Sequence, residues 1–289
     1  MTIVNNRAVA VRMCGALMAL VAAACGGSSS PSAPSTSAAA TTPTVSNVSV
    51  SSSATGVWLG QTHQMSASAT LSNGTTQTSP SGTWGTDATA VATVSSSGLV
   101  TTLSPGDVTV FFDASPGGRA TKRLTVYADF EGTWTGNYQI ASCNQTGGFS
   151  SANFCSVFSV GSVLPFRIVA TSTGTGAVSA TWVLGSVNYG PATGTAGAFF
   201  SSVTLSGSHS DTALPSTSIW QLTQSTPNRI SGSQQLTFTS TSSSGAGTVS
   251  GPILTFAKSS LGMTTQGIGL LTAQPRSVEE LAAALGLKR

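Results

Sequence analysis

Charged side chains are scarce in this sequence, and the scarcity limits the chemistry that the protein can perform. Only 7% of its 289 residues are Asp, Glu, Lys or Arg, against about 25% in an average soluble protein. It contains two histidines, His63 and His209. Acid–base catalysis requires titratable groups that converge in one cleft. We therefore expect no enzymatic activity and no cofactor.

The few titratable side chains also fail to form a recognisable motif. His209 and Asp211 lie two positions apart in a polar turn, but no Gly-x-Ser-x-Gly elbow accompanies them. Asp129 and Glu131 would share one face of a strand, yet no third group supports glycosidase chemistry. Three further aspartates are too dispersed to form a metal site: Asp87, Asp107 and Asp113. The sequence contains no basic patch with interleaved aromatic residues, so nucleic acid is not an expected partner.

The N-terminus has the composition of an export signal. Residues 1–12 carry two positive charges, Arg7 and Arg12, and no acid. Residues 13–24 are an uncharged apolar run, which is shorter than the roughly 20 residues that span a bilayer. This length is typical of the core of a signal peptide, so we predict that residues 1–24 are removed on export.

The residues around the predicted cleavage site, Ala22-Ala23-Ala24-Cys25-Gly26, resemble the lipobox of bacterial lipoproteins. The resemblance implies that Cys25 is lipidated and anchors the protein to a membrane of the cell envelope, the outer membrane or the cell surface, through more than one acyl chain. One residue departs from the pattern, because Ala22 stands where the family usually has leucine. The alternative is an ordinary signal peptide that is cut after the same alanines and leaves Cys25 free.

Residues 25–44 are rich in Ser, Ala, Thr, Pro and Gly and contain neither charge nor a large apolar side chain. Such a segment cannot bury enough apolar surface to offset its ordering entropy. We therefore predict a flexible tether between the anchor and the first folded domain.

Residues 45–128 predict a sandwich of short antiparallel strands. Apolar and polar residues alternate in segments such as 63–71, and turn signals recur about every ten residues. Leu59-Gly-Gln-Thr62, Asn73-Gly74, Trp84, Ala90-Val-Ala-Thr-Val94 and Ser97-Gly-Leu-Val100 resemble the bacterial Ig-like domain, group 2. The resemblance implies that Trp84 packs between two sheets. It also implies a role as a spacer, or as a module that binds carbohydrate or protein, in a surface protein.

Residues 129–259 predict a second antiparallel β domain, so the chain is all-β. Eight candidate strands lie near residues 132–141, 154–160, 163–172, 177–186, 198–206, 217–224, 229–240 and 246–257. An eight-stranded up-and-down meander can close into a barrel, which removes its exposed edges. The alternative is a second open or sandwiched sheet.

The start of this second domain, Gly132-Thr133-Trp134, is similar to the element that opens lipocalin-like barrels, where the tryptophan plugs one end. Four aromatic side chains are expected to face inward, namely Phe166, Trp182, Trp220 and Phe238. They would either line an apolar ligand cavity or fill the core.

Cys143 and Cys155 are close in sequence within an exported domain, which favours a disulfide. The bond would stabilise the protein by roughly 2–3 kcal/mol. The alternative is a pair of reduced thiols buried as small apolar residues. In the tail, residues 260–289, Ser277 and Glu280 fit a capping box that begins a short helix.

The sequence supports two hypotheses for function. In the first, an anchored lipoprotein displays a distal β domain for adhesion or for binding an extracellular glycan or protein. In the second, the distal barrel carries a small apolar ligand. Nothing in the sequence indicates the oligomeric state.

Overall fold

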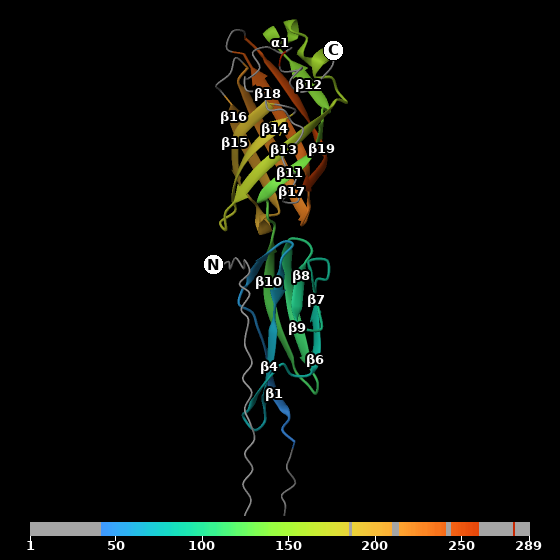
Figure 1. The fold of residues 1–289 in the computed structure, drawn as a ribbon, viewed down its shortest axis with the longest axis vertical. Coiled ribbons are helices and arrows are strands. Elements are labelled where there is room, and N and C mark those ends of the chain that lie inside the picture. Colours follow the sequence, from blue (N-terminus) through green and yellow to red (C-terminus); the bar gives the residue numbers. More distant parts are fainter. Residues whose placement is uncertain (1–41, 185–186, 210–213, 241–243, 260–279, 281–289) are drawn as a thin grey trace, which may run out of the picture.

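The computed structural model describes residues 42–184, 187–209, 214–240, 244–259 and 280. Two β domains follow each other along the long axis of the molecule, a sandwich formed by residues 45–127 and a barrel formed by residues 132–258 (Figure 1). Cys25, the predicted signal peptide and most of the predicted tether lie outside the described residues, as does the predicted C-terminal helix apart from Glu280. Within the described ranges, no helix has the length and apolar character needed to cross a membrane.

The sandwich consists of three small sheets. The first contains β1 (Val45–Ser51), β4 (Ser66–Leu71) and β5 (Thr76–Thr78). The second contains β2 (Gly56–Trp58), β10 (Arg119–Tyr127), β9 (Gly106–Ala114) and β6 (Gly82–Thr86). The third contains β3 (Thr62–Gln64), β8 (Leu99–Thr102) and β7 (Ala92–Val94). All described pairs are antiparallel except β2 with β10.

Alternation along the strands builds the core of the sandwich, as the sequence predicted. In β9 every second residue is buried, so Phe112 points inward while Phe111 lies half-buried beneath the guanidinium of Arg119, 4.1 Å from its ring centroid. Trp84 is half-buried and packs against the two apolar clusters of this domain, with its ring centroid 4.9 Å from that of Phe112. Gly98 has a left-handed φ of +82°, and a Cβ there would lie 3.0 Å from the Trp84 ring, so this turn requires glycine.

The second domain is a closed, eight-stranded antiparallel barrel. Its strands, in hydrogen-bonded order, are β11 (Gly132–Gln139), β13 (Val163–Ser172), β14 (Ala177–Leu184), β15 (Val187–Thr195), β16 (Ser202–His209), β17 (Ser216–Thr226), β18 (Arg229–Thr239) and β19 (Ala246–Lys258). Pairing between β19 and β11 closes the ring. A short strand, β12 (Ser142–Gln145), adds to β19. Closure gives every strand of the ring a neighbour on both sides, which favours a barrel over an open sheet with free edges.

One of the strands predicted for this domain is wrong, and another begins four residues later than predicted. Residues 154–160 do not form a strand, because α1 (Gly148–Ser151) and α2 (Phe154–Val157) form a helical cap at the end of the barrel away from the sandwich (Figure 1). Phe154, Val157 and Phe158 follow helical spacing and are all buried. The strand predicted at 198–206 begins instead with the 3₁₀ turn η1 (Ala198–Phe200), and β16 follows it. The missing eighth strand is β15, whose glycines and proline conceal its strand character.

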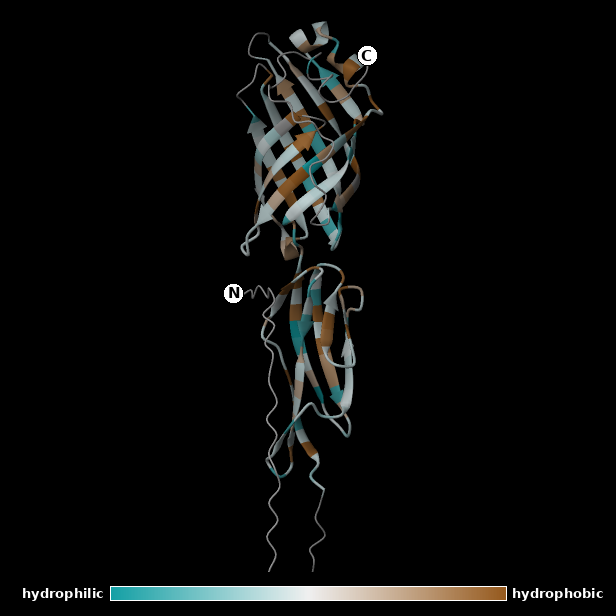
Figure 2. Ribbon diagram, in the orientation of Figure 1, coloured by the Kyte–Doolittle hydropathy of each residue, from teal (hydrophilic) through white to brown (hydrophobic). Residues whose placement is uncertain are grey.

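Apolar side chains fill the inside of the barrel, and hydroxyl groups cover much of its outside. In β17 buried and exposed residues alternate from Ser216 to Gln224. Brown and pale bands alternate along the strands in Figure 2, as this arrangement requires. Trp134 lies inside the barrel near the end that faces the sandwich, where its indole Nε1 donates to the carbonyl oxygen of Phe130 at 2.8 Å.

The two domains contact each other through aromatic rings. The Phe200 ring of η1 lies 4.9 Å from Tyr127 and 6.0 Å from Trp58, measured between ring centroids. The Ala128 amide donates to the carbonyl oxygen of Phe199 at 2.9 Å. Phe199 and Phe200 both have a φ of +53°, a conformation that bulky residues adopt only where surrounding contacts impose it.

Candidate functional site

The four aromatic residues predicted to face inward are all buried inside the barrel. The structure brings three of them together, with the Trp220 ring centroid 5.4 Å from Phe166 and 5.2 Å from Trp182. Phe238 lies apart from this group and packs under the helical cap. The rings contact one another, which is how side chains fill a small barrel. That they line a ligand cavity stays a prediction.

The barrel interior also holds polar atoms that have no hydrogen-bond partner among the described residues. They include Tyr138 Oη, Trp220 Nε1 and both polar atoms of the Gln234 side chain. Trp220 and Gln234 are cross-strand neighbours in the register of β17 and β18. Burial raises the pKa of the Tyr138 phenol, because an apolar interior disfavours the charged form. These atoms retain hydrogen-bonding capacity inside an otherwise apolar core.

The predicted disulfide is present and joins β12 to the cap. Cys143 and Cys155 have Cα atoms 5.7 Å apart. The Cys155 amide also donates to Gln145 Oε1 at 2.8 Å, so two contacts hold the start of α2 against β12. Beneath the cap, the Phe154 ring packs 4.4 Å from Phe158 and 5.8 Å from Phe238. The cap therefore covers one end of the barrel with aromatic rings.

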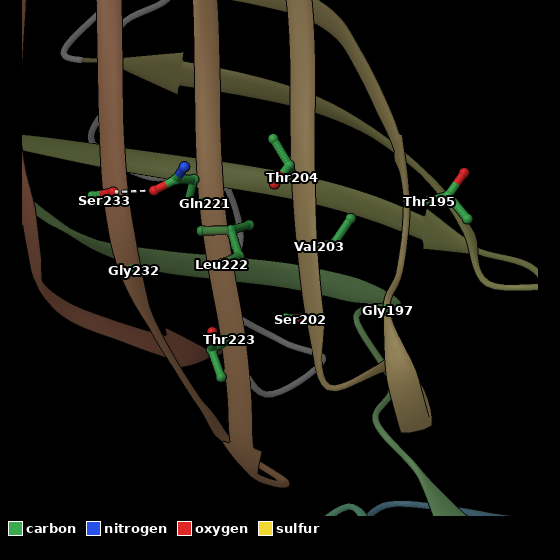
Figure 3. A pocket seen from close by; sticks show the side chains of 10 residues that line it. All are labelled: Thr195, Gly197, Ser202, Val203, Thr204, Gln221, Leu222, Thr223, Gly232 and Ser233. Atoms are coloured by element: carbon green, nitrogen blue, oxygen red, sulfur yellow. Dashed lines mark hydrogen bonds between the residues drawn. The ribbon is translucent and has the colours of Figure 1, made fainter.

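A hollow of about 500 Å³ lies beside β15, β16, β17 and β18. Its lining comes from four consecutive stretches of the barrel wall (Figure 3). The lining residues are Thr195, Gly197, Ser202, Val203, Thr204, Gln221, Leu222, Thr223, Gly232 and Ser233. Since the exposed members of this set point outward, the hollow opens to solvent.

Two of the lining positions are glycines that lie close to neighbouring residues. At Gly232 a Cβ would lie 2.0 Å from the carbonyl oxygen of Gln221, so β17 and β18 approach too closely for any other residue. At Gly197 a Cβ would lie 3.0 Å from Ser202 Oγ. Backbone therefore forms part of the wall.

Uncharged polar groups dominate the exposed lining. The hydroxyls of Ser202, Thr204 and Thr223 are exposed and make no hydrogen bond to another described residue. Ser233 Oγ donates to Gln221 Oε1 at 3.4 Å, the contact drawn as a dashed line in Figure 3. This long contact favours an orientation of the Gln221 amide in which its Nε2 hydrogens are available. The hollow can therefore both donate and accept hydrogen bonds without carrying charge.

The titratable side chains in the described ranges are spread over both domains. No group of three or more His, Cys, Asp or Glu side chains lies close enough there to hold a metal ion. His63 Nε2 lies 2.7 Å from Ser52 Oγ, and burial lowers the pKa of the imidazole. Asp129, at the start of the barrel, accepts from the Glu131 amide at 2.9 Å and lies 3.5 Å from Lys258 Nζ. Each of these contacts joins residues of a single domain.

Comparison with known families identifies the first domain. Residues 44–126 match the family model of the bacterial Ig-like domain (group 2). This match confirms the resemblance seen in the sequence, and the sandwich is hereafter called the Ig-like domain. No curated protein matches the chain significantly.

Sequence reasoning missed the hollow because it missed β15. No strand was predicted from the sequence at Val187–Thr195. Thr195 could therefore not be placed beside β16, and the position of β16 between β15 and β17 could not be predicted. The signal that could have found it is the alternation of Val187, Tyr189 and Ala192, all buried, across the Gly190-Pro191 interruption. The outward residues that line the hollow are small and polar, and such residues form no recognisable sequence motif.

Proposed function

We propose that this chain is an exported, envelope-anchored surface protein whose Ig-like domain displays a non-catalytic barrel for adhesion or extracellular binding. The observation that carries the proposal is an Ig-like domain of a bacterial surface family followed directly by a barrel with a disulfide. Disulfides persist in oxidising compartments outside the cytoplasm, and this supports export.

The arrangement of the Ig-like domain suits display. Its first strand begins at the end of the domain opposite to the barrel, as Figure 1 shows. The longest strands, β9 and β10, each contain nine residues, which corresponds to roughly 30 Å at the rise of a β-strand. An attachment before Val45 would thus be separated from the barrel by the length of this domain, in addition to the predicted tether.

Metabolic labelling with radioactive palmitate in a bacterial host tests the anchor. We expect label on the wild type and on the matched control Cys14→Ala, and no label on Cys25→Ala, since only the thiol at the predicted lipobox accepts lipid. Protease added to intact cells should degrade the labelled protein. Unlabelled wild type, or label that persists in Cys25→Ala, would contradict lipidation at Cys25. Full-length, uncleaved protein in the cytoplasm would contradict export.

A second candidate function is that of a carrier with an apolar ligand inside the barrel. Trp220 Nε1 and the Gln234 amide favour it, because they retain hydrogen-bonding capacity that could fix the polar end of a ligand. The contacts among Phe166, Trp182 and Trp220 weigh against it, since these rings occupy the interior themselves. Native mass spectrometry of protein purified from its own membrane distinguishes the two functions. A co-purified apolar molecule beyond the lipid on Cys25 would favour the carrier.

A further inference from the structure

We propose that the hollow beside β15–β18 is a binding site for a neutral glycan. The proposal rests on the proposed function, because a displayed barrel meets extracellular glycans, and it assigns that function to a defined set of residues. The carrying observation is a hollow of about 500 Å³ lined by exposed hydroxyls and the side-chain amide of Gln221. Sites for small ligands commonly measure about 300–1,000 Å³.

The absence of charged side chains around the hollow favours a neutral ligand over a charged one. Among the outward residues of β16, β17 and β18, the only charged side chain is that of Arg229, at the start of β18 and outside the lining. An anionic or cationic ligand would find no counter-charge there, and charged groups dominate the recognition of such ligands. A neutral ligand rich in hydroxyl groups matches the lining, because each serine or threonine hydroxyl donates one hydrogen bond and accepts others.

The lining also argues against an apolar molecule or a protein partner. Its two apolar residues, Val203 and Leu222, are buried. Protein interfaces are enriched in Tyr, Trp, Phe, Met and Arg and depleted in Ser, whereas this lining contains none of the former residues and two serines. The one large apolar side chain exposed on β17, Ile219, lies outside the hollow.

Gln221 is the residue that should contribute most to recognition. Its Oε1 accepts from Ser233 Oγ at 3.4 Å, a long contact that favours one orientation of the amide, with the Nε2 hydrogens available to a ligand. Thr204 is its direct cross-strand neighbour on β16. The Gln221 NH2 group offers two donor hydrogens to a sugar ring, and the Thr204 hydroxyl offers one donor and an acceptor. The lining contains no aromatic ring for stacking, so we expect weak affinity for a single site, with dissociation constants in the millimolar range, and stronger attachment when many displayed copies bind one polymer.

Saturation-transfer NMR on the purified protein tests the proposal. The probes are cellotetraose, maltotetraose and the tetramer of N-acetylglucosamine, with tetragalacturonate as the anionic control. Two variants form a matched pair, Gln221→Ala in the lining and Gln235→Ala, an exposed glutamine on β18 outside it. We expect binding of at least one neutral probe. Gln221→Ala should weaken it roughly fivefold or more, as expected for a lost hydrogen bond, and Gln235→Ala should leave it unchanged.

Four outcomes would overturn the proposal. The first is no saturation transfer to any neutral probe at about 10 mM, a concentration that reveals millimolar binding. The second is tighter binding of tetragalacturonate than of the neutral probes. The third and fourth are binding of the neutral probe that both variants weaken equally, or that Gln221→Ala does not weaken. Both glutamines are exposed, so thermal unfolding of the two variants should coincide with that of the wild type. The assay uses purified protein and is independent of lipidation. Failure here therefore leaves the palmitate test of the anchor intact, and the reverse also holds.

Discussion

Removal of the disulfide between Cys143 and Cys155 measures how firmly the helical cap belongs to the barrel. The two cysteines are 12 positions apart. In the chain-entropy account, opening a loop of this length costs about 3 kcal/mol of stability at 25 °C, because the unfolded chain gains freedom. The double variant Cys143→Ser, Cys155→Ser should lose this amount. The rings of Phe149, Phe154 and Phe158, which are buried beneath the cap, should keep the cap docked in the native state.

Urea unfolding followed by tryptophan fluorescence provides the assay. Trp134, Trp182 and Trp220 report on the barrel, and Trp58 and Trp84 report on the Ig-like domain, so two transitions are expected. With a denaturant slope of about 1–3 kcal/mol/M, the barrel midpoint should fall by about 1–3 M. The midpoint of the Ig-like domain serves as an internal control and should not move.

A chemical control complements the variant. Wild-type protein treated with dithiothreitol should unfold at the same urea concentration as the untreated double variant, because both lack the cross-link. A barrel midpoint that stays in place would refute the entropic argument. A fall of equal size in both domains would also refute it, since it would show that the cap stabilises the whole molecule.

Three further predictions concern a strand contact, the domain junction and the behaviour in acid. Gly232→Ala should destabilise the barrel by about 1–3 kcal/mol in urea unfolding, because its Cβ would lie 2.0 Å from the Gln221 carbonyl oxygen; an unchanged midpoint would contradict this. Phe200→Ala removes the ring that packs on Tyr127 and Trp58 of the Ig-like domain, so small-angle scattering should show a broader range of domain orientations; because Phe200 also packs against the barrel core, the barrel midpoint should fall while that of the Ig-like domain stays close to wild type. A hydrogen bond from Arg123 holds the pKa of Asp107 below its ordinary value of 3.8. This contribution to stability is complete above the unfolded-state pKa and is lost as the pH falls through the lower folded-state pKa. In urea unfolding, the free energy of unfolding of the Ig-like domain should therefore fall less between pH 7 and pH 3 in Asp107→Asn than in the wild type.

Alternation and turn spacing predicted most of the fold. Strands such as β13 and β14, with one apolar face each, were placed within two residues at either end. The helical cap was not predicted, because a short apolar run such as 154–158 fits a strand or a helix equally well. In the structure this segment packs against Phe238 and is joined to β12 by the bond between Cys143 and Cys155, contacts between segments that the local pattern does not specify.

The hollow could not be predicted from the sequence for a related reason. Serine and threonine on an outward face have many roles, so their presence at Ser202, Thr204 and Thr223 predicts no site. Their significance arises only when β15, β16, β17 and β18 lie side by side, with β17 and β18 in close approach at Gly232. The inward direction of Phe166, Trp182 and Trp220 was predictable from alternation, whereas their mutual contacts across the barrel were not.

The sequence by itself determined which functional groups the two domains contain. Scarce charge, a period of two and frequent turns dictate β domains with hydroxyl-rich surfaces, and the cysteine spacing allows one short cross-link. Only the tertiary structure decided that eight strands close into a ring, that the segment around Cys155 becomes a cap, and that a hollow forms beside four strands. The physical reason is that the local pattern of apolar and polar residues determines which face of each strand is buried. Closure of the barrel, docking of the cap and formation of the hollow depend instead on contacts between residues far apart in the chain.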